Sequence, residues 1–150
     1  MSATGLDVFD RTLQTTNIWL NEICETIGPD RKVAWKVLSV VLHKLRDRIP
    51  VPLAAHLGAE LPLLVRGVYY DQFQPGKQPS KVDFDEFMAD VGKWLSDTHP
   101  IDPQDAVTAV FGVLSHHIAP EQIAKVQNAL PQKLRAFWVS ARDRLLAGDE

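Results

Sequence analysis

An internal repeat is the feature of this sequence that most constrains its fold. Residues 49–69 align without a gap with residues 118–138, so the offset is 118 minus 49, or 69 residues. The aligned pairs that keep their character are Ile49 and Ile118, Ala55 and Ala124, Leu57 and Val126, Leu61-Pro62 and Leu130-Pro131, Arg66 and Arg135, Val68 and Phe137, and Tyr69 and Trp138. A repeated pattern of apolar positions indicates a repeated packing unit. The sequence therefore predicts two copies of one helical unit.

Apolar residues in the first copy recur at intervals of three and four, the spacing that places them on one face of a helix. This spacing predicts four helices, over residues 6–27, 30–48, 51–58 and 62–70. The inward stripe of the first helix is predicted to be Leu13, Trp19, Leu20, Ile23 and Ile27. Gly28-Pro29 is expected to end that helix, and Asp30 to cap the next one.

The second copy repeats this order, with helices predicted over residues 83–97, 102–117, 120–128 and 131–146. The inward stripe of the first of these is predicted to be Phe84, Phe87, Val91, Trp94 and Leu95. Overlaying the first helices of the two copies sets Cys24 opposite Gly92, so the offset there is 92 minus 24, or 68 residues. The second helix of the first copy is expected to be about three residues longer than its counterpart, a difference of roughly one turn.

These patterns predict an all-α fold of about eight helices in two quasi-equivalent four-helix repeats. No segment alternates with the period of two that a strand requires. The repeats span about residues 6–72 and 83–146 within one domain of residues 1–150. Between them, residues 73–82 contain two prolines and one glycine without apolar periodicity, which predicts a flexible linker. Each repeat alone has little interior, so the two are expected to share one core.

Composition narrows the class of protein. With 150 residues and 45% hydrophobic content, the chain fits one soluble domain. The net charge of −3 lacks the basic excess of a nucleic-acid-binding protein, so nucleic-acid binding is disfavoured. We expect neither a secretory leader nor a membrane span, since no apolar run reaches membrane-spanning length. Its single cysteine, Cys24, suits a reducing compartment, and we expect a cytoplasmic bacterial protein.

His116 and His117 are the only adjacent histidines. They lie near a predicted helix end, where neighbouring side chains point about 100° apart, so the pair is poorly placed to bind one ion. In the ungapped alignment they fall on Asp47 and Arg48, which are strongly charged. We therefore expect both histidines to face water.

The remaining residues with reactive side chains form no recognisable motif. His43, His56 and His99 show no metal-ligand spacing, and Cys24 is expected to be a small, largely buried filler rather than a nucleophile. No phosphate loop, nucleophile elbow or zinc motif occurs. The second helix is basic, through Arg31, Lys32, Lys36, Lys44, Arg46 and Arg48, as solvated helix faces often are. We expect no cofactor, no metal and no catalytic residue.

Two groups of residues stand out as interaction or structural candidates. Arg66 and Arg135 occupy equivalent positions one turn into a helix, where a guanidinium can tie together the carbonyl ends of neighbouring helices. Tyr69, Tyr70 and Phe73 place three aromatic rings beside the linker. They could form a recognition patch or seal the junction between the repeats, and sealing is favoured.

The order of motifs resembles a known family. The motifs are Leu61-Pro62, Arg66-Gly67-Val68-Tyr69-Tyr70, Phe84-Asp85-Glu86-Phe87, Asp102-Pro103, Ala129-Leu130-Pro131 and Leu134-Arg135 with Phe137. Together they resemble the bacterial domain-of-unknown-function family numbered 2267, from about Asp10 to Trp138. The resemblance implies a small, helical, cytoplasmic protein. It implies no role for any residue, because the family has no established activity.

The sequence favours a non-catalytic interaction or scaffold module over an enzyme. A duplicated helical unit without convergent reactive groups most simply presents a surface to a protein partner. The alternative is a small-ligand binder or enzyme with a cleft between the two repeats. Self-association is a third possibility, because Leu145 and Leu146 extend the last helix beyond the aligned region.

Overall fold

The structure is a computed structural model that describes residues 3–98 and 100–148, apart from the side chains of residues 142 and 146–148. Over these residues it contains helices and no strand, which confirms the all-α class. In chain order the helices are α1 (Asp7–Ile27), α2 (Arg31–Arg46), α3 (Val51–Ala59), α4 (Leu63–Tyr70), the 3-10 helix η1 (Pro75–Lys77), α5 (Phe84–Trp94), α6 (Pro103–His117), α7 (Pro120–Asn128), α8 (Gln132–Val139) and α9 (Ala141–Gly148). His99, for which the sequence shows no metal-ligand spacing, lies outside the described residues.

Aspartate caps start three of the longer helices. The Asp30 carboxylate accepts hydrogen bonds from the backbone N–H groups of Lys32 and Val33, at 2.9 and 3.3 Å. Asp83 and Asp102 accept the corresponding bonds at the starts of α5 and α6. Each cap satisfies a backbone donor that has no partner within its own helix.

The predicted last helix is interrupted at Ser140, which separates α8 from α9. The Ser140 hydroxyl donates to the Phe137 carbonyl oxygen, and the Arg144 guanidinium donates to the same oxygen at 2.7 Å. Side chains thus satisfy a carbonyl at the end of α8, and the chain continues as α9, the ninth α-helix of the described residues. Leu145 contacts α6, since a Cβ built on Gly112 would lie 2.5 Å from its Cδ1. The side chain of Leu146 lies outside the described residues, and self-association stays a prediction.

The second helices differ in length by less than the sequence predicts. α2 has 16 residues and α6 has 15, so the difference is one residue rather than about three. The remaining two residues lie in the connections, which span residues 47–50 after α2 and 118–119 after α6. The longer connection contains Asp47 and Arg48, which become part of the site described below.

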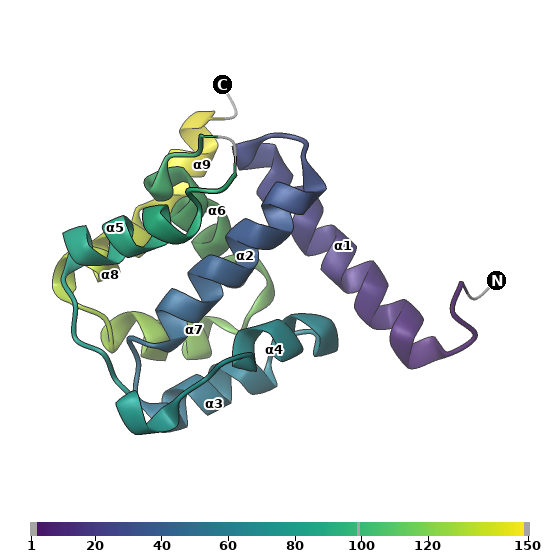
Figure 1. Ribbon diagram of the computed structural model, residues 1–150, viewed down its shortest axis with the longest axis horizontal. Coiled ribbons are helices and arrows are strands. Elements are labelled where there is room, and N and C mark those ends of the chain that lie inside the picture. The colour runs from purple at the N-terminus through teal and green to yellow at the C-terminus, as the bar shows by residue number, and fades with distance from the viewer. Residues whose placement is uncertain (1–2, 99, 149–150) are drawn as a thin grey trace.

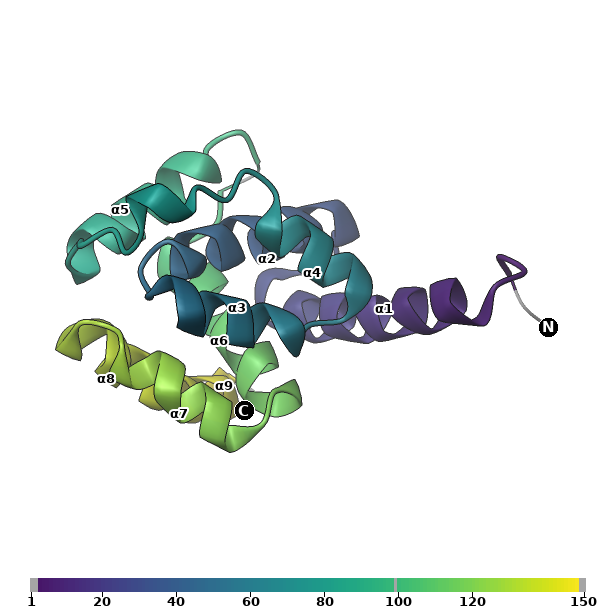
Figure 2. The same ribbon diagram turned by 90° about the horizontal axis from the view of Figure 1, so that it is seen from below.

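Helices from both halves pack around a common interior (Figures 1 and 2). α1 packs on α2 and α6, α2 packs on α6 and α5, and α3 packs on α7. The largest fully buried side chains are Trp19, Tyr69, Phe87, Phe111 and Trp138, which come from five different helices. The buried apolar residues of the two halves belong to one connected cluster.

The N-terminal half of α1 extends away from the rest of the molecule (Figures 1 and 2). None of residues 7–15 is buried, whereas Thr16, Trp19, Leu20 and Ile23 are. Leu13, predicted to face inward, is 42% exposed, although the Leu64 backbone N–H at the start of α4 donates to the neighbouring Thr12 hydroxyl at 2.9 Å. Trp94, also predicted to face inward, is 52% exposed at the end of α5.

The bounds of four helices recur at the offset of the sequence repeat. α3 and α7 begin at 51 and 120 and end at 59 and 128, and α4 and α8 begin at 63 and 132 and end at 70 and 139. Every one of these differences is 69 residues. The aligned pairs Ile49 and Ile118, Leu57 and Val126, Leu61 and Leu130, and Tyr69 and Trp138 are all buried. A common origin of the two halves stays a prediction, and these correspondences support it.

Candidate functional site

Arg66 and Arg135 both bind backbone carbonyl groups at the end of the preceding helix. Arg66 Nη2 donates to the carbonyl oxygens of Ala59 and Leu61, at 3.1 and 3.0 Å. Arg135 makes the corresponding bonds in the second half, to the carbonyl oxygens of Gln127, Asn128 and Leu130. Both arginines thus join a short helix to the one that follows it, by satisfying carbonyls that the helix end leaves free.

The aromatic segment packs against the first half. Tyr69 is fully buried, and its hydroxyl donates to the Ala54 carbonyl oxygen at 2.8 Å. Burial raises the pKa of the Tyr69 phenol far above its usual range. Tyr70 donates to the Ala55 carbonyl oxygen at 3.3 Å, and Phe73 lies beneath the Arg46 guanidinium, 5.1 Å from it. These rings therefore join α4 to α3 and to the end of α2.

A groove of about 420 Å³ lies between the end of α2, the segment after α4 and one side of α5. Its charged lining residues are the basic Lys44, Arg46, Arg48 and Lys77 and the acidic Asp47 and Asp90. The remaining lining residues are Val40, His43, Gln72, Gln74, Gln78, Ser80 and Trp94. We call this feature the basic groove. It contains residues of both halves, as the alternative cleft predicted from the sequence would, but it contains neither Arg66 nor Arg135.

Two cations of the basic groove share one carboxylate oxygen. Lys44 Nζ and Arg48 Nη2 lie 3.3 and 3.2 Å from Asp90 Oδ2. The side chains of Lys44 and Arg48 are only 16% and 6% exposed. Arg48 Nε is buried and has no hydrogen-bond partner in the described part of the chain. The Lys44 ammonium also lies over the ring of Trp94, 4.8 Å from its centre.

The predicted linker forms one wall of the basic groove and is bonded to the end of α2. The Gln78 side-chain amide donates to the carbonyl oxygens of Arg46 and Ile49. The Ser80 backbone N–H donates to the Asp47 carbonyl oxygen at 2.7 Å. These bonds attach the predicted linker to the end of α2 by satisfying carbonyl groups that the helix end leaves free.

His43 lies beside this wall, and its lowered pKa favours the neutral form of the ring at neutral pH. Its Nε2 is 2.6 Å from the Val68 carbonyl oxygen, to which the neutral ring donates. Burial lowers the pKa of His43, and the nearby Arg46 cation lowers it further against the opposing effect of the Val68 hydrogen bond. A neutral His43 adds a donor contact between α2 and α4 without adding charge to the groove.

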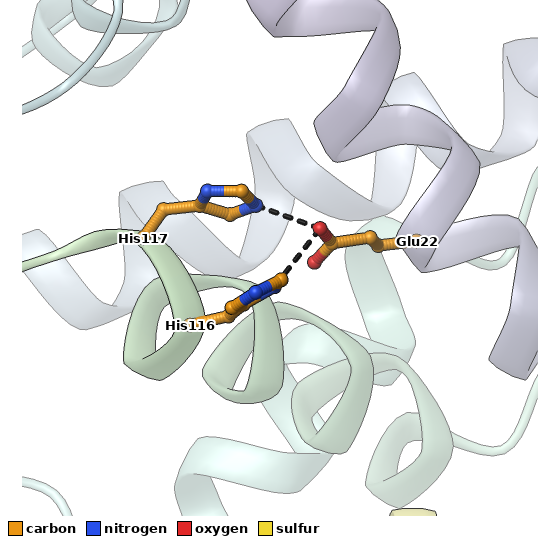
Figure 3. Close-up of side chains that lie close together, drawn as sticks. All are labelled: Glu22, His116 and His117. Carbon is orange, nitrogen blue, oxygen red and sulfur yellow. Dashed lines mark hydrogen bonds and ion pairs between the residues drawn. The ribbon is translucent and has the colours of Figure 1, made fainter.

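Glu22, His116 and His117 converge at the contact between α1 and α6 (Figure 3). His116 Nδ1 and His117 Nε2 lie 3.0 and 2.7 Å from the same oxygen, Glu22 Oε1. The His117 ring stacks on Trp19, with centres 5.3 Å apart. Both histidines are exposed, as predicted, and both also contact Glu22, which the sequence did not indicate. The rings of His116 and His117 lie side by side, with centres 4.4 Å apart, and both point toward the Glu22 carboxylate (Figure 3).

The two sites occupy equivalent positions in the repeat. His117 aligns with Arg48, since 48 plus 69 is 117, and Glu22 aligns with Asp90 at the first-helix offset of 68. Arg48 follows α2 and pairs with Asp90 of the other half, while His117 ends α6 and pairs with Glu22 of the other half. Each half thus contributes a nitrogen side chain to one pair and a carboxylate to the other. From the sequence, this reciprocal pairing could have been found only by combining the 69-residue alignment with the 68-residue alignment of the first helices.

Cys24 lies on α1, partly buried against the core. Burial raises the pKa of the Cys24 thiol, Asp30 raises it further, and Arg31 opposes this effect. A raised pKa lowers the fraction of thiolate at neutral pH, and the thiolate is the form that reacts. This environment suits the predicted filler role better than that of a nucleophile.

The fold and the sites define a small all-α protein whose two halves exchange side chains across their contact. The chain belongs to the family described as "Uncharacterized conserved protein (DUF2267)", which it matches over residues 16–137. No curated protein gives a significant match. Within the described residues, no helix is both long enough and apolar enough to cross a membrane.

Proposed function

We propose that this chain is a non-catalytic interaction module of the bacterial cytoplasm, which binds a partner protein through an anionic group held in the basic groove. The observation that carries this proposal is the sharing of Asp90 Oδ2 by two largely buried cations, Lys44 and Arg48. The anionic group is a carboxylate or a phosphate, because both match the donor geometry of arginine.

The charges around Asp90 are unbalanced. One carboxylate faces one ammonium and one guanidinium, both of which are mostly removed from water. A buried charge without a full counter-charge is unfavourable, because it loses the hydration energy that it has in water and gains too little attraction in return. A second anion in the groove would supply the missing negative charge. It would also give Arg48 and Lys44 acceptors that Asp90 alone does not provide.

The surroundings favour a segment of a protein as the source of that anion. The groove opens beside Trp94, whose ring is half exposed and provides an apolar surface next to the cations. Aromatic and arginine side chains are enriched where proteins bind one another. A free small anion is the competing ligand, since the volume of about 420 Å³ also falls in the range of small-molecule sites.

Calorimetric titration tests the proposal with two probes, a glutamate-rich octapeptide and inorganic phosphate. We expect the peptide to bind and its affinity to fall as salt screens the charges. Lys44→Gln should weaken binding about tenfold, the effect of losing a charged hydrogen bond of ~1.5 kcal/mol. The substitution leaves Asp90 and Arg48 as a balanced pair, so the fold should persist. Lys125→Gln is the matched control, because Lys125 is exposed on α7 outside the groove.

Each other outcome counts against the proposal. Binding of phosphate without the peptide would favour the small-ligand alternative. Equal affinity for the peptide in the Lys44→Gln and Lys125→Gln proteins would move the interaction away from the groove. No binding of either probe would remove the anion as the recognised group.

A further inference from the structure

We propose that Glu22, His116 and His117 form a binding site for a divalent transition-metal ion such as Zn²⁺. The site is separate from the basic groove and does not depend on the function proposed for it. It contains two imidazole nitrogens and one carboxylate oxygen, brought together from α1 and α6 (Figure 3).

The spacing of the three ligand atoms suits one ion. One ligand atom from each residue lies within 4.8 Å of the other two. Zn²⁺ binds imidazole nitrogen and carboxylate oxygen at about 2.0–2.2 Å, so ligand atoms in a tetrahedral site stand about 3.4 Å apart. The two nitrogens now lie 3.0 and 2.7 Å from Glu22 Oε1. Side-chain adjustments on the order of 1 Å would therefore bring all three ligand atoms to tetrahedral spacing around one ion.

The site is partly preorganised. His117 is held by its stacking on Trp19, which is 1% exposed. The side chains of Glu22 and His117 are 23% and 25% exposed, so both are confined by the packing of α1 on α6. His116 is more open, with its side chain 68% exposed, and is free to adjust. A site that needs only one mobile ligand to move loses little conformational entropy on binding.

The local electrostatics favour a cation. Glu22 carries a negative charge when ionised, and the two histidines end α6, whose C-terminal carbonyl groups give that end a partial negative charge. A metal ion binds the unprotonated nitrogen of a neutral imidazole.

The ligand types select the class of ion. Imidazole nitrogen suits Zn²⁺, Co²⁺, Ni²⁺ and Cu²⁺, whereas Mg²⁺ and Ca²⁺ prefer sites made of oxygen alone. Three protein ligands leave a fourth tetrahedral position for water or an external ligand. His116 is largely exposed, so water or an external ligand can reach the site. A bound ion would also link α1 to α6 and therefore the first half of the chain to the second.

A competition titration of tag-free protein with Zn²⁺ and a chromophoric chelator tests this inference. We expect one Zn²⁺ ion per chain. Glu22→Gln and His116→Gln should each lower the affinity at least about tenfold, since even outer-shell partners of metal ligands cost about 10- to 100-fold when removed. His56→Gln is the matched control, because His56 is exposed on α3 and should not affect binding. His116 is exposed, so its substitution should preserve the fold, as circular dichroism can verify.

Long-range ¹H–¹⁵N spectra of the histidine rings identify the ligand atoms. Zn²⁺ should shift Nδ1 of His116 and Nε2 of His117, the two nitrogens that now face Glu22. The inference is overturned if no ion binds stoichiometrically, or if the Glu22→Gln, His116→Gln and His56→Gln proteins bind Zn²⁺ equally well. Shifts confined to His43 or His56 would overturn it too.

Discussion

Single polar side chains join the short helices of this protein, and Tyr69 is the most buried of them. Its ring is fully buried, and its hydroxyl donates to the Ala54 carbonyl oxygen. The aligned residue in the second half, Trp138, donates from its indole N–H to the Ser115 hydroxyl at 2.8 Å. The repeat therefore preserves a buried aromatic donor, although the acceptor comes from a different element.

We expect Tyr69→Phe to lower the free energy of unfolding by ~1–2 kcal/mol, the usual effect of losing a buried hydrogen bond. Tyr70→Phe is the control, because the Tyr70 hydroxyl makes a longer, exposed bond of 3.3 Å. Its effect should stay below ~0.5 kcal/mol. Urea denaturation followed by circular dichroism measures both. Equal effects of the two substitutions would mean that the buried Tyr69 hydrogen bond stabilises the fold no more than the exposed Tyr70 one.

His43 should make stability depend on pH in the acid range. Its pKa is lowered in the folded protein, chiefly by burial and also by Arg46, although the Val68 hydrogen bond, Asp47 and Asp71 oppose the shift. Below the ordinary histidine pKa of about 6.5, the unfolded chain binds a proton that the folded protein does not. The contribution of His43 to stability is therefore lost as pH falls below that value, with a slope of at most ~1.4 kcal/mol per pH unit.

Denaturation of the wild type and of His43→Gln between pH 7 and about 5 checks this prediction. The free energy of unfolding should fall less steeply in the variant. His56→Gln, which changes an exposed histidine, should follow the wild-type curve. A parallel fall in all three proteins would assign the acid sensitivity to other groups.

At the scale of helices, what the sequence could predict depended on local chemistry. Aspartate and proline mark most helix starts, since capping and a fixed φ act within a few residues. The break at Ser140 has no proline or glycine to mark it, and depends on Arg144 reaching back to the Phe137 carbonyl oxygen. The predicted burial of Leu13 in α1 and Trp94 in α5 is also wrong. Periodicity indicates which face of a helix is apolar, but not whether another helix covers that face along its whole length.

Two glycines within helices offer a matched test of packing against helix propensity. A Cβ added at Gly58 of α3 would lie 2.6 Å from Cζ of the Tyr70 ring. Gly67 of α4 is exposed, with no atom within 4 Å of such a Cβ. A side chain at the first position would therefore meet the Tyr70 ring, and nothing comparable lies beside the second.

We expect Gly67→Ala to raise the free energy of unfolding by ~0.5–1 kcal/mol through better helix propensity. Gly58→Ala should lower it by ~1–3 kcal/mol, because displacing a ring exceeds the same gain in propensity. Thermal and urea denaturation give both values. Stabilisation by Gly58→Ala would show that Tyr70 moves aside at little cost.

At the scale of the whole molecule, the pairing of the two halves determines where the candidate sites lie. Arg48 with Asp90 and His117 with Glu22 both join one half to the other. The all-α class could be predicted from the sequence, since it depends on periodicity. The sequence did not indicate the basic groove or the Glu22 cluster, because residues such as Lys44 and His116 acquire their partners only when the halves pack together.

We expect neither half to fold alone. Residues 3–80 expressed without the rest would expose the faces of α1 and α2 that pack on α6. A chain of this length buries too little surface to offset such a loss. Thermal denaturation should show no cooperative transition for the fragment, in contrast to the full chain. A sharp transition together with native-like near-ultraviolet circular dichroism would contradict the shared core.

The projection of α1 has a consequence for hydrogen exchange. Residues 7–15 include no buried residue, whereas Trp19 and Ile23, later in the same helix, are almost inaccessible to solvent. Isolated helical turns open readily in water, and packed ones open only with the surrounding core. Backbone amides along α1 should therefore exchange with deuterium rapidly at the start of the helix and slowly beyond Thr16. The change in exchange rate within this one helix should mark the residue at which packing against the core begins.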